Sequence, residues 1–361
     1  MSKKELVVVA MSGGVDSSVS AGLLKQKGYE VIGITLCFNL KGACNKGAIS
    51  CGYEGIEEAK KVADKLGIPH YVLNMQKDLE EKVIKEFCSE YLKGRTPNPC
   101  VRCNQFIKFD ILLKKALAMG ARYLATGHYA RIVFNRNYFL LKKAIDKTKD
   151  QSYFLYRLNQ RQLKNIIFPL GNYKKAQVKD IAKKFGLGVA ERPSSQEICF
   201  LCGKDYRQFL KERLRDKECF QMEEGLIVDK QGNSLGRHKG IAFYTIGQRQ
   251  GLGIAKGYPL YIIHIDAEKN LITVGTKKDV YKKEFLLKEP NFILNLKKNK
   301  IVAKVKIRYN HREALADLEF YKDKIRVCFR KPQFAITPGQ SAVFYDKDTV
   351  LGGGIIDTVI G

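Results

Sequence analysis

Near the start of the chain stands the sequence Leu6-Val7-Val8-Val9-Ala10-Met11-Ser12-Gly13-Gly14-Val15-Asp16-Ser17. Its first half is a short apolar run rich in valine, which is typical of a strand buried on both faces. Its second half places two glycines and two serines directly before an amphipathic stretch over 15–27 that predicts a helix. A buried strand, a glycine-rich turn and a helix indicate the start of an α/β domain with a parallel sheet.

The turn between this strand and helix has the properties of an anion-binding loop. Its glycines allow a tight turn that presents backbone N–H groups, and the helix N-terminus adds its dipole. The hydroxyls of Ser12 and Ser17 can donate to phosphate oxygens. Asp16 would repel phosphate, so its carboxylate indicates a Mg²⁺ ion that bridges to the phosphates. The loop matches neither a Walker A motif nor a dinucleotide fingerprint, and an ordinary turn with an aspartate cap is the alternative.

Strand and helix patterns alternate through the first half of the chain. We expect further strands over 30–36, 70–74 and 122–126, and helices over 54–66, 77–93 and 104–119. This alternation predicts an α/β fold with a doubly wound parallel sheet. Ligands of such sheets bind beyond the carboxyl ends of the strands. We expect that edge to hold residues 12–17, 36–37 and 127–128.

The second half of the chain has a different texture. A hairpin is expected over 131–142, and helices over 174–185 and 204–215. After about Glu218 the sequence consists of short β-branched runs separated by Gly, Asn and Asp, which indicates all-β modules. We place one domain boundary near 205–218 and another near 280–290, where Lys288-Glu289-Pro290 interrupts the pattern.

The charge balance favours a polyanionic partner. The chain has 64 Lys and Arg against 37 Asp and Glu, a formal net charge of +27. A balance this basic is typical of nucleic-acid-binding proteins, although lysines scattered over solvated helix faces are the alternative. No apolar run approaches the ~20 residues of a membrane span, and no signal peptide is recognisable. We therefore expect a cytoplasmic protein with no membrane partner.

The chain contains ten cysteines, and two pairs have C-x-x-C spacing: Cys100 with Cys103, and Cys199 with Cys202. In a reducing cytosol such residues are core fillers, metal ligands or catalysts. One structural zinc held by both pairs is one alternative. Polar loops with Pro or Ser around the pairs argue against a core role. Cys37, Cys44 and Cys51 lie in one loop, where their even spacing either binds metal or is incidental.

Long motifs around these cysteines select a family. They include Asn98-Pro99-Cys100-Val101-Arg102-Cys103, Ser194-Ser195-Gln196-Glu197-Ile198-Cys199 and the stretches 12–17, 126–129, 149–153, 244–253 and 337–340. Together they resemble the bacterial tRNA-specific 2-thiouridylases of the N-type ATP pyrophosphatase superfamily, from Val7 to Gly354. The resemblance implies a catalytic pyrophosphatase domain over 1–210, a small mostly-β central domain over 211–284 and a tRNA-binding C-terminal β-barrel over 285–361.

The resemblance also implies residue roles. Cys103 matches the family's nucleophile and Cys199 its persulfide carrier. The residues that match the ATP site are Ala10, Met11, Ser12, Gly13, Gly14, Val15, Asp16, Ser17, Leu36 and Gly127. The residues that match contacts to the target base or elsewhere on the tRNA are Asn98, Pro99, Cys100, His128, Lys149, Asp150, Gln151, Arg308, Tyr309 and Gln340. Without the resemblance, His128 is equally a local hydrogen-bonding group, and Arg308-Tyr309 a solvated face.

The chemistry that these roles require can be stated from the residues. Adenylating O2 of a uridine with ATP turns a poor leaving group into AMP and releases pyrophosphate. Sulfur then enters from a persulfide on Cys199, whose thiolate form is reactive. Cys103 either reduces the persulfide to release sulfide or attacks it after transfer, and either route ends in a Cys103–Cys199 disulfide that a reductant opens. The resemblance implies tRNAs for Lys, Glu and Gln as substrates, and a cysteine desulfurase or a sulfur-relay protein as donor.

Cys100 departs from the family pattern, in which an aspartate stands at this position. A thiol cannot replace a carboxylic acid as an acid–base group at the same pKa. Cys100, Cys103 and Cys199 could instead hold a 4Fe–4S cluster, since three thiolates would leave one iron open for hydrosulfide. The alternative is that Cys100 occupies the position of the aspartate and has no role in the reaction.

Two other functions are alternatives to the thiouridylase hypothesis. One is an amide ligase resembling argininosuccinate synthetase, which shares the phosphate loop but needs neither Cys103 nor Cys199. The other is a non-catalytic RNA-binding protein with a relic nucleotide site, against which the intact loop argues. ATP-dependent pyrophosphate release in the presence of tRNA separates all three.

Overall fold

The computed structural model describes residues 4–38, 53–189, 198–215, 220–294, 299–322 and 324–360. The chain divides into two compact units. The first contains the residues up to 83, together with 99–204 and 348–351. The second contains 84–98, 205–347 and the residues from 352 onward. No helix within the described ranges is both long enough and apolar enough to cross a membrane.

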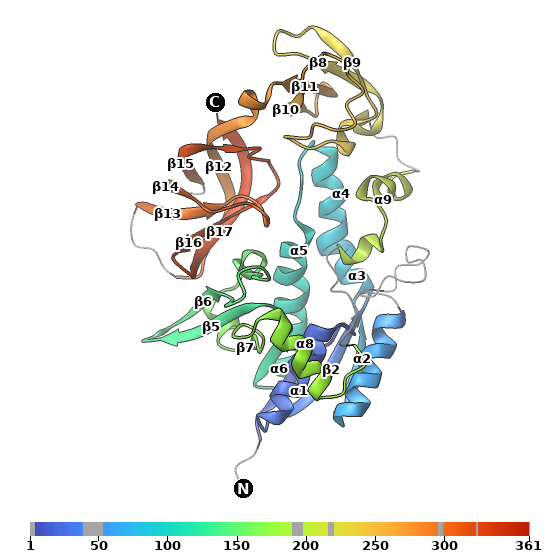
Figure 1. The fold of residues 1–361 in the computed structure, drawn as a ribbon, viewed down its shortest axis with the longest axis vertical. Coiled ribbons are helices and arrows are strands. Elements are labelled where there is room, and N and C mark those ends of the chain that lie inside the picture. Colours follow the sequence, from blue (N-terminus) through green and yellow to red (C-terminus); the bar gives the residue numbers. More distant parts are fainter. Residues whose placement is uncertain are drawn as a thin grey trace. The chain divides into compact units, whose positions relative to one another are not determined.

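The first unit is built on a parallel sheet with the strand order β3-β2-β1-β4-β7 (Figure 1). Strands β2 and β4 lie on opposite sides of β1, so the direction of winding reverses between β1 and β4. Such a switch point is where open α/β sheets bind ligands, beyond the carboxyl ends of the strands. The strands are β1 (Leu6–Ala10), β2 (Glu30–Cys37), β3 (His70–Asn74), β4 (Tyr123–Thr126) and β7 (Ile166–Ile167).

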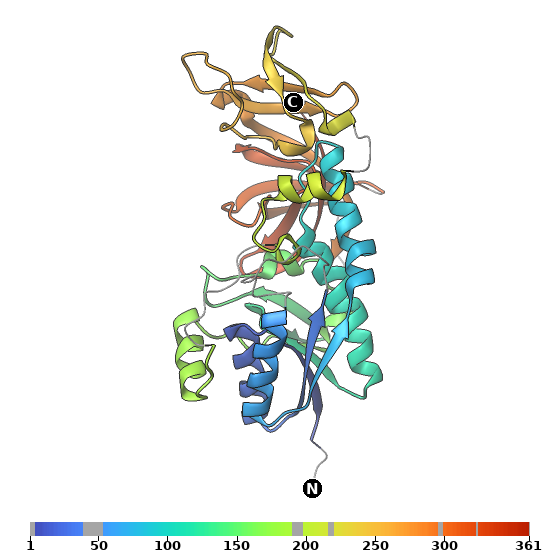
Figure 2. The same cartoon turned by 90° about the vertical axis from the view of Figure 1, so that its right-hand side faces the viewer.

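Helices cover both faces of this sheet, as Figure 2 shows. One face carries α1 (Val15–Gln26), α2 (Tyr53–Leu66) and α8 (Lys175–Lys184), and the other carries the continuous run α5 (Pro99–Arg102), η2 (Cys103–Leu112) and α6 (Leu113–Ala118). Val7, Val9, Val19, Ala63 and Val178 are all buried in the core between the sheet and the first group. The predicted doubly wound sheet is thus confirmed.

Shorter elements complete the first unit. Its β5–β6 hairpin turns at Arg136, whose φ of 56° fits the expected turn. The elements are α3 (Gln76–Leu79), η1 (Glu80–Ile84, which reaches the second unit), β5 (Ala130–Asn135), β6 (Tyr138–Lys143), η3 (Ser152–Leu155), α7 (Gln160–Leu163) and η4 (Cys199–Leu201).

The second unit contains two β structures. A four-stranded sheet has the order β10-β11-β8-β9, with β8 parallel to β11 and the other pairs antiparallel. Six further strands follow the order β12-β15-β14-β13-β16-β17, and pairing of β12 with β17 closes them into a barrel. The expected all-β modules and the barrel are confirmed. The small sheet is formed by β8 (Gly225–Val228), β9 (Ser234–His238), β10 (Tyr261–Asp266) and β11 (Leu271–Gly275).

Alternate side chains of the barrel strands fill its interior, as the period of a β-strand requires. Phe285, Phe329, Phe344 and Ile356 are fully buried. The barrel strands are β12 (Tyr281–Phe292), β13 (Lys300–Lys306), β14 (Ala314–Phe320), β15 (Ile325–Phe334), β16 (Ser341–Asp346) and β17 (Thr349–Ile360). The helical elements of this unit are α4 (Lys85–Leu92), α9 (Tyr206–Arg213), η5 (Phe220–Met222), η6 (Ile241–Phe243) and η7 (Lys277–Val280).

Two expectations from the sequence need correction. Lys288-Glu289-Pro290 does not interrupt the fold, because strand β12 runs through it, with a register shift between Lys288 and Asn291 and a φ of 49° at Glu289. A proline is tolerated inside a strand at such a bulge. The expected helices over 77–93 and 104–119 each contain a π-helical segment, η1 and η2, and the second begins earlier, at Pro99. The structure also groups residues 84–98 with the second unit.

Candidate active site

The loop after β1 is held by its own serines. The hydroxyl of Ser17 accepts the Ser12 N–H at 3.1 Å and donates to the carbonyl of Gly14 at 3.1 Å. Gly14 is the N-cap residue of α1 and has no side chain to close the helix end. The first-turn N–H groups of a twelve-residue helix therefore face a compact, serine-lined turn. Such an end suits an anion, as the sequence predicts for residues 12–17.

The carboxylate of Asp16 is bound by two donors from distant parts of the first unit. The hydroxyl of Tyr129 donates to Oδ1 at 2.7 Å, and the Nζ of Lys175 donates to the same oxygen at 2.6 Å. The Lys175 side chain is 15% exposed and that of Asp16 is 28% exposed. Burial and the neighbouring Asp16 raise the pKa of Tyr129, so its hydroxyl stays a donor. Asp16 is therefore held in one orientation at the loop.

Gly127 joins the loop after β4 to the loop after β1. A Cβ at this position would lie 2.8 Å from the Ser17 nitrogen and 2.9 Å from the Asp16 carbonyl carbon. Two backbones can approach this closely only when the residue between them is glycine. The fold thus brings residues 12–17 and Gly127 together at the switch point, as the sequence predicts. Leu36, the other expected ATP-site residue, is half-buried in β2.

His128 follows Gly127 and packs between the rings of Phe109 and Phe168. Its Nδ1 is hydrogen-bonded to the hydroxyl of Thr126 at 2.7 Å. Burial and the ammonium of Lys108 lower the pKa of His128 well below its usual value, so the ring is neutral at physiological pH.

Three thiols gather in the same unit. Cys103 is buried at the start of η2, while Cys100 in α5 and Cys199 in η4 are half-buried. Burial and proximity to Cys199 raise the pKa of Cys100 to about 11. Burial raises the pKa of Cys103 to about 12, with Cys199 and Cys100 adding to the shift. The fold therefore brings together thiols that are about a hundred positions apart in the sequence.

Lys108 is the cation of this cysteine group. Its charge lowers the pKa of Cys100, of Cys103 and of His128, so it lies near all three. In a π-helix the i→i+5 hydrogen bond places residues five apart on nearly the same face, and Cys103 and Lys108 have that spacing in η2. Lys108 therefore acts both on the cysteine group and on His128, which follows Gly127 at the phosphate loop.

The raised pKa values predict slow thiol reactivity at neutral pH. In reduced, iron-free protein, alkylation of Cys103 and Cys100 by iodoacetamide should rise about tenfold per pH unit from 7 to 9.5 without levelling. An ordinary cysteine levels off near its pKa of about 8.5, and levelling there would contradict the burial. Peptide mass spectrometry measures both rates. The same shifts stabilise the fold below pH ~8.5, and this stability is lost as the pH rises toward 11–12.

The geometry supports a Mg²⁺ site at Asp16 but does not support a metal cluster at the three cysteines. Asp16 fits a Mg²⁺ site, because among the described residues only Oδ1 is engaged by side chains, and Mg²⁺ needs one or two carboxylates besides phosphates. Within the described ranges no three His, Cys, Asp or Glu side chains converge closely enough to hold a metal ion. The thiols of Cys100, Cys103 and Cys199 therefore do not fit a cluster in this arrangement. Cys44 and Cys51 lie outside the described residues.

Some residues that the resemblance assigns to tRNA are engaged within the protein. Asp150 is buried and accepts from the N–H groups of Ala144 and Ser152 and from the Ser152 hydroxyl. The Oε1 of Gln151 accepts the N–H of Tyr129 at 3.0 Å. Lys149 is half-buried beside them.

In the second unit, the Nη1 of Arg308 donates to the carbonyls of Phe334 and Ala335 at 3.2 and 3.1 Å. Tyr309 lies under the ammonium of Lys306 at 5.3 Å. The Nε2 of Gln340 donates to the carbonyl of Thr96 at 2.9 Å. Arg308 and Gln340 therefore form hydrogen bonds within the protein itself, and a role in tRNA binding would be additional to these bonds.

Known proteins resemble this chain over nearly its whole length. A tRNA-specific 2-thiouridylase (MnmA) of Acetivibrio thermocellus is 50% identical over 369 residues, which cover 99% of this chain and 100% of the relative. One from Caldanaerobacter subterraneus subsp. tengcongensis is 50% identical over 358 residues, 97% of each chain. The chain belongs to the tRNA-specific 2-thiouridylase family. The resemblance stated from the sequence is thereby confirmed.

Three domain families match in succession along this 2-thiouridylase family member. They are described as a tRNA methyl transferase HUP domain over residues 5–203, a tRNA methyl transferase PRC-barrel domain over 207–276 and an aminomethyltransferase β-barrel domain over 282–356. Among solved structures, a 4-thiouridine synthetase–RNA complex with bound ATP covers 59% of the chain and 51% of its own, at 16% identity and a TM-score of 0.38. A similarity this low carries no argument.

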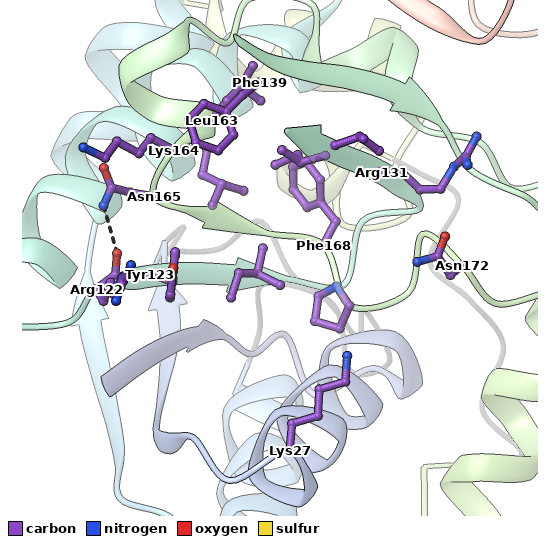
Figure 3. A pocket seen from close by; sticks show the side chains of 15 residues that line it. Lys27, Arg122, Tyr123, Arg131, Phe139, Leu163, Lys164, Asn165, Phe168 and Asn172 are labelled. Carbon is purple, nitrogen blue, oxygen red and sulfur yellow. Dashed lines mark hydrogen bonds between the residues drawn. The ribbon is translucent and has the colours of Figure 1, made fainter. Parts of the chain in front are cut away.

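A pocket of about 440 Å³ in the first unit lies away from the site of this thiouridylase family member. It is found beside the first residues of β4 and β7, where Arg122 and Asn165 are joined by a hydrogen bond of 2.9 Å (Figure 3). Lys27 and Phe168 also line it, but none of the residues assigned to ATP, sulfur or tRNA does. This pocket is therefore not the predicted site.

Sequence reasoning missed three residues that the structure places at this site in the 2-thiouridylase fold. Tyr129 and Lys175 bind Asp16, and Lys108 acts on the thiols. Tyr129 lies in a quoted motif and could have been singled out, because it directly follows Gly127-His128. Lys175 and Lys108 are two of many lysines on expected helices, and nothing in their local sequence marks them.

Proposed function

We propose that this protein is a tRNA 2-thiouridylase, which adenylates the C2 oxygen of the wobble uridine with ATP and then replaces it by sulfur. One observation carries the proposal: a phosphate loop and a group of three thiols lie in one unit, where Gly127 packs against the loop and Lys108 acts electrostatically on Cys100, Cys103 and the neighbouring His128. An amide ligase has no use for the thiols. An RNA-binding protein with a relic site has no use for a carboxylate held by Tyr129 and Lys175.

In the first step, O2 of the uridine attacks the α-phosphorus of ATP and pyrophosphate leaves. The N–H groups at the start of α1 and the hydroxyls of Ser12 and Ser17 orient the phosphates. Lys175 and Tyr129 fix the carboxylate of Asp16. Mg²⁺, when bound by Asp16 and the phosphates, would neutralise charge on the leaving pyrophosphate.

In the second step, the terminal sulfur of a Cys199 persulfide attacks C2 of the uridine and AMP leaves. Cys103 then attacks the Cys199 sulfur, so that the S–S bond breaks and its electron pair stays on the thiouridine sulfur. A Cys103–Cys199 disulfide remains, and an external dithiol reduces it. Burial keeps Cys103 protonated at neutral pH, while Lys108 opposes this effect and favours its thiolate.

The direct test is the nucleoside content of tRNA. Deletion of the gene should remove 2-thiouridine derivatives from tRNAs for Lys, Glu and Gln, and complementation should restore them, as measured by mass spectrometry of digested tRNA. Unchanged thiouridine in the deletion strain would refute the function. Purified protein should also release pyrophosphate from ATP only with tRNA present. Purifying the protein's interaction partners would test whether a cysteine desulfurase or a sulfur-relay protein supplies the sulfur.

Cys100 decides between the persulfide route and the iron–sulfur hypothesis. The persulfide route predicts that iron-free protein thiolates tRNA at full rate from a persulfide donor, and that Cys100→Ala does the same. The cluster hypothesis predicts that activity follows iron content and that Cys100→Ala loses both. Anaerobic reconstitution with iron and sulfide assays measures this. In the second case, Cys103 and Cys199 would be ligands.

A further inference from the structure

The phosphate loop has no cation of its own. Residues 10–18 contain no Lys or Arg, and their one charged side chain, that of Asp16, is negative. A Walker A loop, in contrast, carries a lysine that reaches the β- and γ-phosphates. Pyrophosphate leaves with several negative charges. A loop that releases it therefore needs a cation from elsewhere in the fold, in addition to its own N–H groups and hydroxyls.

Lys175 is the cation that the fold places at this loop. Its Nζ donates to Oδ1 of Asp16 at 2.6 Å and lies 5.8 Å from the centre of the Tyr129 ring. Asp16 is in the first turn of α1, where the N–H groups face the expected phosphates. No other Lys or Arg within the described ranges forms an ion pair with residues 10–18. The ammonium of Lys175 therefore lies at the end of α1 where pyrophosphate is expected.

The backbone of Lys175 is held in place, while its ammonium can change partner. Lys175 is the first residue of α8, and its N–H donates to Oδ2 of Asp146 at 2.9 Å. Oδ1 of Asp146 accepts from the N–H and the hydroxyl of Thr148 at 3.0 and 2.6 Å. Val178, in the same helix, is buried in the core. A lysine ammonium is carried by a flexible four-carbon chain, so it can turn from the carboxylate to a phosphate without movement of the helix.

We propose that Lys175 is a catalytic residue of adenylation, whose ammonium passes from Asp16 to the β- and γ-phosphates of ATP. This inference rests on the proposed function. As O2 of the uridine bonds to the α-phosphorus, the bond from that phosphorus to the bridging oxygen breaks, and its electron pair stays on pyrophosphate. The ammonium neutralises this charge and keeps its protons. Without ATP, Lys175 and Asp16 neutralise each other, so the empty site holds no unpaired charge at this partly buried place.

The alternative is that Lys175 is a positioning residue, which acts on the reaction only through Asp16. The two roles differ once the carboxylate is removed. If Lys175 only holds Asp16, replacing it has no effect on pyrophosphate binding in an Asp16→Asn protein. If its ammonium binds phosphate, the replacement weakens binding in that protein as well. A double-variant cycle of this kind isolates the direct contact.

The experiment is calorimetric titration of the full-length protein with pyrophosphate in EDTA, so that neither metal nor turnover contributes. Asp16→Asn should bind pyrophosphate more tightly than the unmutated protein, because the ammonium is released and the repelling carboxylate is gone. Adding Lys175→Met should then weaken binding by about 10- to 100-fold, as loss of a charge-assisted hydrogen bond does. Adding Lys174→Met instead is the matched control. Lys174 is the exposed residue just before α8, and its bond to Gln177 uses the backbone N–H, which the variant keeps.

Equal pyrophosphate affinity in Asp16→Asn with and without Lys175→Met overturns the proposal and leaves Lys175 a positioning residue. An equal loss with Lys174→Met also overturns it, because a diffuse charge effect would then explain the result. So does an absence of metal-free binding by Asp16→Asn at millimolar pyrophosphate. If Lys175→Met does not fold, Lys175→Gln takes its place.

The single variant Lys175→Met should lower pyrophosphate release from ATP in the presence of tRNA by about 10²-fold. A normal rate of release would overturn the catalytic role. If the unmutated protein modifies no tRNA, the proposed function fails. The pyrophosphate titration still tests the contact in that case, because it uses neither tRNA nor sulfur.

Discussion

Replacing Cys199 by Ser is expected to abolish 2-thiouridine formation, with a loss on the order of 10³-fold or more. A serine hydroxyl can carry no persulfide, so the sulfur has no carrier. Cys199 lies in the short helix η4, while the nucleotide loop is formed by residues 12–17 after β1. In the proposed assignment, adenylation uses the loop and does not use Cys199. Pyrophosphate release in the presence of ATP and tRNA should therefore stay measurable in Cys199→Ser.

The matched control is Cys328→Ser, because Cys328 is also a half-buried thiol but lies in barrel strand β15. It should retain both partial reactions. Thiouridine is measured by mass spectrometry of tRNA digests, and pyrophosphate by a coupled assay. If Cys199→Ser lost pyrophosphate release together with sulfur transfer, the division of labour between loop and cysteines would be wrong.

Replacing Asp16 by Asn is expected to lower adenylation by about 10²- to 10³-fold. The amide keeps the shape of the carboxylate but not its charge, so it is a poor ligand for Mg²⁺. It also leaves the ammonium of Lys175, which now bonds Oδ1 at 2.6 Å, without its counter-charge. The fold should remain intact, because Asp16 is partly exposed and Tyr129 can still donate to the amide oxygen.

Affinity for tRNA should be unchanged in Asp16→Asn, since the loop is expected to contact ATP only. Asp180→Asn, on the exposed side of α8, removes the same charge nearby and should have no effect on either property. Equilibrium binding of ATP with and without Mg²⁺ gives a readout independent of turnover. A large drop in tRNA affinity, with normal ATP binding, would assign the loop another role.

Much of the first unit could be predicted because its signals are local. The valine run at 6–10 must form a buried strand, and the Gly-Gly turn with two serines must precede a helix. Dihedral preferences and hydrophobic period act over a few residues, so they are readable in sequence. The same holds for the hairpin at 130–143, which matches the hairpin expected over 131–142. Family motifs predicted the barrel, which the structure confirms, and the cysteine roles, which stay predictions.

The partners of these local features were decided by the tertiary structure. Lys175 lies 159 positions from Asp16, and Gln340 lies 244 positions from Thr96. Their contacts arise because the winding of the sheet reverses between β1 and β4 and because the barrel turn receives residues 96–97. The pKa of Cys103 likewise follows from burial and, in part, from Cys199 in the distant helix η4. Such contacts depend on how the helices and strands pack. The local conformational preferences of a segment do not determine which distant side chain will contact it.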